Sequence, residues 1–129
     1  MPLQNRVTPY SSIEANPARG LLMGNRGCLH DDQRQLVSQG WRHRAWISSV
    51  LHYGPQRRML MQPRRYTELF FLDEAVAPAA GHRPCVLCRR AVFERFCTAL
   101  FPKNRVRRHT STQRCMRNVW PAFVAGVLE

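Results

Sequence analysis

Residues 67–90 read TELFFLDEAVAPAAGHRPCVLCRR, and this stretch decides the fold that we expect. Its first six residues are rich in aromatic and aliphatic side chains, which predicts a β-strand over 67–72. Asp73 is a favourable N-cap for a short helix, and Gly81 lies beyond the expected end of that helix. A loop then leads to a closely spaced pair of cysteines at the start of a second helix.

The second helix is predicted from apolar residues that recur at helical spacing between Cys88 and Pro102. These residues are Val92, Phe93, Phe96, Leu100 and Phe101. Pro102 ends the pattern because proline cannot continue a helix. Residues 103–129 are basic and then apolar without a clear period, so we expect a separate tail there, either truncated or disordered.

Upstream of residue 67 the sequence predicts further strands. Two short apolar segments flank Gly24-Asn25-Arg26-Gly27, and glycines around an asparagine are typical of a β-hairpin turn, here within 19–30. The runs 45–53 and 57–62 predict two strands that continue into 67–72 as a meander. Residues 1–18 contain several prolines and little periodicity, so we expect an extended N-terminal arm.

These elements together predict one α+β domain over 19–102. It would contain a small antiparallel sheet, built from the hairpin and the meander, with a short helix and a longer C-terminal helix. The length of 129 residues suits one domain with a modest core, and 44% hydrophobic residues argue against wholesale disorder. No apolar run is long enough to span a bilayer, and the first residues lack a secretory leader, so we expect a cytoplasmic protein without a membrane partner.

The cysteines point to metal binding. Thiols stay reduced in the cytoplasm, and an odd total of five cysteines does not suit a disulfide framework. Cys85-x-x-Cys88 can bind one Zn²⁺ from a tight turn that enters a helix. Cys28 and His30, two residues apart on the expected hairpin, would share one face and complete a Cys₃His cage that staples the domain.

Other cysteines and histidines leave alternatives to this cage. His82 could replace Cys28 or His30 as a ligand, because it lies three residues before Cys85. Cys97 lies beside Phe96 in the second helix, where we expect a core residue, and Cys115 has no evident partner.

The charge suggests a polyanionic partner. Formal net charge is +12, and all of the 20 basic residues except Lys103 are arginine. Arginine offers forked donors to phosphate, so we expect contact with nucleic acid, DNA more than RNA. A scattered, solvated surface is the alternative. The candidate contacts among the arginines are Arg26, Arg64, Arg65, Arg83, Arg89 and Arg90.

Residues 67–90 resemble the zinc-binding N-terminal domain of the Ada methyl phosphotriester repair family. That family also places a strand and an alanine-rich helix before a Gly-aromatic-Arg-Pro-Cys-x-x-Cys turn, which here is Gly81 to Cys88 with His82 at the aromatic position. The resemblance implies that Cys85 and Cys88 bind zinc. Ada-like domains carry two more cysteines upstream, one of which accepts a methyl group; this chain has only Cys28, followed by His30.

A wider pattern is similar to a bacterial family without an assigned activity. Its segments here are GNRGCLH at 24–30, RYTELFFLDEA at 65–75 and the Cys85 motif. That pattern leaves position 28 variable, which favours His30 over Cys28 as the functional residue.

Three other functions compete with a binding module. One is an enzyme, either by alkyl transfer to Cys28 or by metal-assisted hydrolysis with His30, Asp31 and Asp32 around an open zinc position. Another is thiol redox chemistry, although the βαβ context of a thioredoxin-like domain is missing. The third is a structural subunit whose apolar segment 119–128 packs on another chain.

Overall fold

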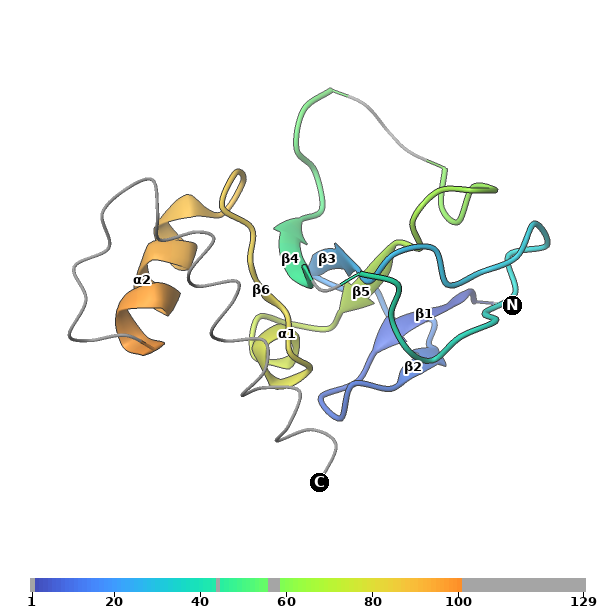
Figure 1. The fold of residues 1–129 in the computed structure, drawn as a ribbon, viewed down its shortest axis with the longest axis horizontal. Coiled ribbons are helices and arrows are strands. Elements are labelled where there is room, and N and C mark those ends of the chain that lie inside the picture. The colour runs from blue at the N-terminus through green and yellow to red at the C-terminus, as the bar shows by residue number, and fades with distance from the viewer. Residues whose placement is uncertain (1, 44, 56–58, 101–129) are drawn as a thin grey trace.

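The computed structural model of the protein describes residues 2–43, 45–55 and 59–100. A six-stranded sheet in the order β2-β1-β5-β3-β4-β6 forms its centre (Figure 1). One short helix lies between β5 and β6 in the sequence, and a longer helix follows β6. The elements in chain order are β1 (Gln4–Val7), β2 (Ile13–Ala15), β3 (Leu22–Asn25), β4 (Ile47–Val50), β5 (Leu69–Phe71), α1 (Val76–Ala79), β6 (Arg83–Pro84) and α2 (Arg90–Leu100).

The α+β class is confirmed, but the expectation of a purely antiparallel sheet is wrong. β1 runs parallel to β5, and β4 runs parallel to β6. β3 is antiparallel to both of its neighbours, β4 and β5. Parallel pairs need long connections between their strands. Patterns in neighbouring segments of the sequence therefore do not indicate which strands will pair in parallel.

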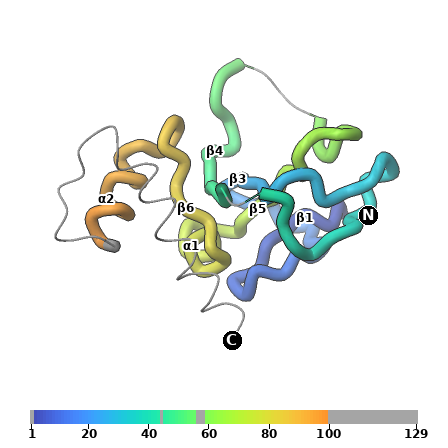
Figure 2. Tube along the Cα trace, viewed as in Figure 1, coloured from blue at the N-terminus to red at the C-terminus, as the bar shows by residue number. Residues whose placement is uncertain are grey.

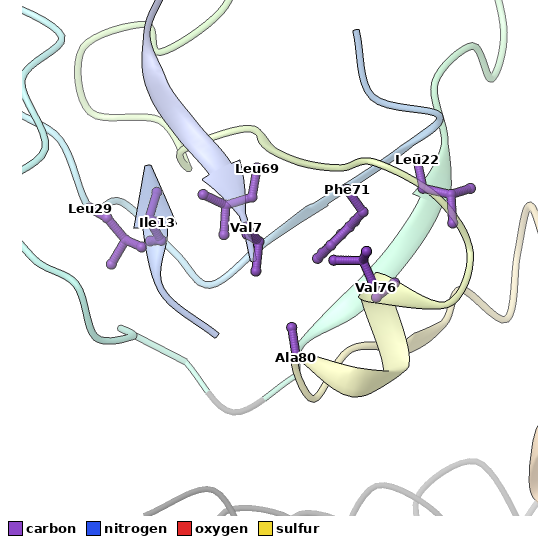
Figure 3. Close-up of a cluster of buried hydrophobic side chains, with 9 residues drawn as sticks. Val7, Ile13, Leu22, Leu29, Leu69, Phe71, Val76 and Ala80 are labelled. Carbon is purple, nitrogen blue, oxygen red and sulfur yellow. The ribbon is translucent and has the colours of Figure 1, made fainter. Parts of the chain in front are cut away.

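The N-terminal residues belong to the sheet rather than to an extended arm. β1 and β2 form an antiparallel hairpin. Val7 and Ile13 are only 1% and 2% exposed and join the main core. Figure 3 shows this core, in which Val76 and Ala80 from the α1 region face Phe71 of β5. Burial of these apolar side chains provides the driving force that ties the first residues to the domain.

The predicted hairpin around Gly24-Asn25-Arg26-Gly27 is also wrong. Gly24 and Asn25 lie inside β3, which pairs with β4 and β5 and not with residues 28–30, the predicted second arm of the hairpin. Gly24 is glycine for steric reasons. A Cβ atom there would lie 2.9 Å from Cε2 of Phe71 and 3.2 Å from Nδ1 of His82, and closer still to the carbonyl oxygen of Ile47.

The expected strand over 57–62 is absent in its described part, residues 59–62, which form a turn. Met61 is fully buried and has a left-handed backbone with φ of 51°. Its amide donates to the Glu68 carboxylate at 2.7 Å. The buried side chain and the carboxylate fix this turn locally, where a strand would need a partner along its whole length.

The two other predicted strands and both predicted helices are confirmed, but Asp73 is not the N-cap of α1: the helix begins at Val76, and its N-cap, Ala75, makes no side-chain cap bond. β4 and β5 lie within the predicted runs 45–53 and 67–72, and Asp73 accepts hydrogen bonds from the amides of Ala75 and Val76 at the start of α1. In α2 the buried residues are Phe93 and Cys97, so the expected core position of Cys97 is confirmed.

The chain passes from β5 through α1 and β6 to α2, which lies at the opposite end of the sheet from β2 (Figure 2). Among the described helices, none is long and apolar enough to cross a membrane. The predicted tail, 103–129, lies outside the described residues.

Candidate metal centre

The Cys85–Cys88 turn joins the edge strand β6 to α2. The amide of Cys85 donates to the carbonyl of Ser48 at 2.9 Å, which attaches the start of the turn to β4. The carbonyl of Cys85 accepts the amide of Arg89 at 3.1 Å, which closes the turn directly before the helix. Both thiols are free and partly exposed. The backbone therefore presents two sulfur atoms from one short, anchored segment.

The local environment favours ionisation of Cys85. Partial burial raises the pKa of this thiol, but four hydrogen bonds outweigh that effect and lower the pKa below its ordinary value. Two of the bonds come from the backbone amides of Cys88 and Leu87, and two from the side chains of Cys88 and Ser49. The thiolate is the form of cysteine that binds metal and attacks electrophiles. The hydrogen bonds thus favour the charged, reactive form of the Cys85 sulfur.

The two serines of β4, Ser48 and Ser49, lie on opposite faces of the strand. Ser49 bonds the Cys85 sulfur, whereas Ser48 accepts a hydrogen bond from Arg89 Nη1 at 2.8 Å. Successive strand residues point to opposite faces. The signal that could have found Ser49 is its position in a predicted strand that could lie next to the cysteine turn.

The structure does not join His30 to the cysteine pair. Its Nε2 bonds the carbonyl oxygen of Gln62 at 3.0 Å, and its Nδ1 lies 2.5 Å from Oγ1 of Thr67. Because a carbonyl only accepts, Nε2 donates to Gln62, and in the neutral ring Nδ1 accepts from the Thr67 hydroxyl. Thr67 Oγ1 in turn accepts the amide of Leu29 at 2.8 Å. Both ring nitrogens of His30 are therefore occupied in a buried structural network.

Cys28 and the acidic pair that follows it also have local roles. The Cys28 sulfur lies 3.7 Å from the carbonyl oxygen of His30. Asp31 accepts the amides of Gln33 and Gln35 at 2.9 Å each and so organises a turn. Within residues 2–43, 45–55 and 59–100, no group of three or more His, Cys, Asp or Glu side chains could hold a metal ion. The predicted Cys₃His cage is therefore not assembled among these residues.

His82 is not a free ligand either. It is buried, its Nδ1 bonds the carbonyl of Ile47 at 3.0 Å, and its Nε2 accepts from Arg26 Nε at 3.1 Å. Burial, reinforced by the charge of Arg26, lowers its pKa to about 3, so the ring is neutral at physiological pH. Phe71 packs edge-on against it at a centroid distance of 4.6 Å. The motif that precedes the cysteines thus contributes to the core.

Arg26 is a buried cation. It is 1% exposed, its guanidinium bonds the backbone oxygen and hydroxyl of Ser11 at 3.0 and 2.7 Å, and it stacks over Trp46 at 4.2 Å. No carboxylate pairs with it among the described residues. Burial lowers its pKa to about 10, which still leaves it charged at neutral pH. Arg26 is therefore not available to a partner on the surface.

The other arginines that were predicted to contact nucleic acid differ in how far their side chains are exposed to solvent. Arg89 is buried and bonded to Glu74 and Ser48. Arg83 is half-buried, with its guanidinium 5.7 Å from the ring centroid of Phe93. Three arginines remain exposed, namely Arg64, Arg65 and Arg90. Arg90 also bonds Glu94 one helical turn later, at 3.3 Å.

Comparison of the chain with models of protein families, with curated proteins and with solved structures gave no match. The candidate site is therefore defined by the geometry of this chain alone. That geometry consists of two partly exposed thiols at the junction of β4, β6 and α2, with hydrogen bonds that lower the pKa of Cys85.

Proposed function

We propose that the protein is a zinc-binding module in which the thiolates of Cys85 and Cys88 hold the metal. The hydrogen bonds that reach the Cys85 sulfur from the amides of Leu87 and Cys88 and from Ser49 carry this proposal. They favour the charged sulfur before metal arrives, and zinc binding requires that form. A cytoplasmic location would keep both thiols reduced.

Two thiolates provide half of a tetrahedral zinc shell. The remaining positions would be filled by water or by donors outside the described residues. Cys28 and His30 are not included, because their contacts lie within their own turn and with Thr67 and Gln62. This proposal therefore keeps the cysteine pair of the sequence prediction and omits its second half.

Zinc content of purified variants tests the proposal. We expect the full chain to retain zinc after dialysis, and Cys85→Ser and Cys88→Ser to lose it. Cys28→Ser and His30→Gln should retain zinc at the level of the unmodified chain. Circular dichroism of each variant separates loss of metal from loss of fold. A zinc-free full chain, or equal zinc content in all four variants, would refute the metal assignment.

The second part of the proposal is contact with nucleic acid, DNA more than RNA. Arg64 and Arg65 are exposed residues of a turn that three hydrogen bonds stabilise. The Met61 amide bonds Glu68, and the Gln62 carbonyl accepts from both the Arg65 amide and the His30 ring. An anchored turn loses little conformational freedom when its arginines bind phosphate. The net charge of +12 would attract a polyanion over a longer range.

Salt-dependent DNA binding tests this second part. If Arg64 and Arg65 each neutralise a phosphate, replacing both with Gln should reduce the slope of log K against log salt by about two. Arg34→Gln is a matched control, because Arg34 is also exposed and has the same φ of 61° as Arg64. An unchanged slope in the double variant, or an equal loss in the control, would contradict the phosphate contact.

A further inference from the structure

An open pocket of about 400 Å³ lies between the end of the sheet and the two helices. Its apolar walls come from Pro78 of α1, Pro84 of β6, and Val92 and Phe96 of α2. This volume lies within the range of about 300–1,000 Å³ that is usual for small-molecule sites. The pocket is distinct from the cysteine turn, since Ser48, and not Ser49, lines it.

The charged groups that line the pocket are two arginines and one carboxylate, Glu74, and its neutral polar groups are Ser48 and His82. Arg89 lines the pocket and is 8% exposed, and Arg95 of α2 joins the lining from an exposed position. A guanidinium has five N–H donors, and within the described residues Arg89 uses them only toward Ser48 and Glu74. Arg95 has no ion pair within the described part of the chain. Donors therefore remain for an acceptor that enters the pocket.

Glu74 indicates which acceptor fits. Its carboxylate bonds Arg89 Nη2, although 66% of its side chain is exposed. Because the Arg89 guanidinium is buried, loss of its carboxylate partner would be costly, and Glu74 supplies that partner from an exposed position. The chain thus places its own carboxylate against the buried guanidinium from the solvent side. A ligand carboxylate can make the same bond once Glu74 turns outward.

We propose that this pocket binds a small organic carboxylate. The carboxylate bonds the guanidinium groups of Arg89 and Arg95, and the apolar body of the ligand packs on Val92 and Phe96. Arginine matches this group because its planar fork fits two carboxylate oxygens. The apolar walls favour an organic anion over a bare inorganic one, since burial of apolar surface adds affinity. The inference is independent of zinc and of nucleic acid.

Nuclear magnetic resonance titration of the full chain with 3-phenylpropionate tests the proposal. At about 150 mM salt, where screening weakens unspecific attraction, we expect saturable shifts at the amides of Ser48 and Phe96. The uncharged 3-phenylpropionamide should bind at least about tenfold more weakly, because it cannot form charge-assisted hydrogen bonds. Equal binding of the acid and the amide would overturn the proposal, as would shifts that never saturate.

Two variants with opposite expected effects on binding distinguish loss of a specific contact from damage to the fold. Arg95→Gln should weaken binding of 3-phenylpropionate about tenfold through loss of one charged donor. Glu74→Gln should tighten binding, because it removes the competing carboxylate. A damaged pocket would not bind more tightly. Unchanged affinity in Arg95→Gln, or weaker binding in Glu74→Gln, would refute the assigned roles. Arg34→Gln, which removes an exposed arginine outside the pocket lining, should bind like the unmodified chain.

Discussion

Replacement of Gly24 by alanine tests the packing at the centre of the sheet. The new Cβ atom would overlap the carbonyl oxygen of Ile47 and lie 2.9 Å from Cε2 of Phe71. The first neighbour is backbone of the adjacent strand β4, and the second is a fully buried ring. Neither can move aside as the end of a flexible side chain could. The β3–β4 pair must therefore separate locally, or the ring must leave its rotamer.

We expect Gly24→Ala to lower the free energy of unfolding by about 3 kcal/mol or more, at the upper end of overpacking effects. That is a large share of the roughly 5–15 kcal/mol that stabilises a typical domain. Gly40→Ala is the control, because its Cβ would meet only the Ser38 hydroxyl at 3.4 Å and should change stability by about 0.5 kcal/mol or less. Urea unfolding measures both. Equal midpoints for the two variants would show that β3 and β4 do not approach as described.

Two further predictions concern buried polar groups. The pKa of His82 falls from 6.5 to about 3 on folding, so below about pH 6.5 the unfolded chain binds a proton that the folded protein does not. The free energy of unfolding should therefore decline as pH drops below about 6.5, by up to about 1.4 kcal/mol per pH unit. Urea unfolding at several pH values measures this slope, which His82→Gln should remove. Thr67→Val leaves the buried Leu29 amide without its acceptor and should lower the free energy of unfolding by about 1–3 kcal/mol, while Thr98→Val, on the exposed face of α2, should have little effect.

Local sequence patterns predicted those elements that depend on local interactions. The helical spacing of Val92, Phe93 and Phe96 predicted α2, and an aromatic run predicted β5. The parallel pairing of β1 with β5 could not be read from the sequence, because nothing in residues 4–7 specifies a partner more than 60 positions away. The role of Gly24 depends equally on distant neighbours, since only the folded sheet brings Ile47 and His82 against it.

The same distinction separates the two halves of the predicted metal site. Cys85 and Cys88 are neighbours in sequence, so a single turn suffices to bring them together. The expectation for Cys28 and His30 assumed a strand that is not formed there, and the partners of His30 lie more than 30 residues away in the sequence. Charge alone likewise gave no sign that Arg26 would be buried against His82.

X-ray absorption at the zinc edge of the purified full chain examines the proposed coordination itself. If Cys85 and Cys88 hold the metal, the spectrum should contain at least two sulfur neighbours at about 2.3 Å from zinc, and Cys85→Ser should lose sulfur scattering. A shell of nitrogen and oxygen alone, or a sulfur signal that persists in the Cys85→Ser, Cys88→Ser double variant, would mean that this turn is not where the metal binds.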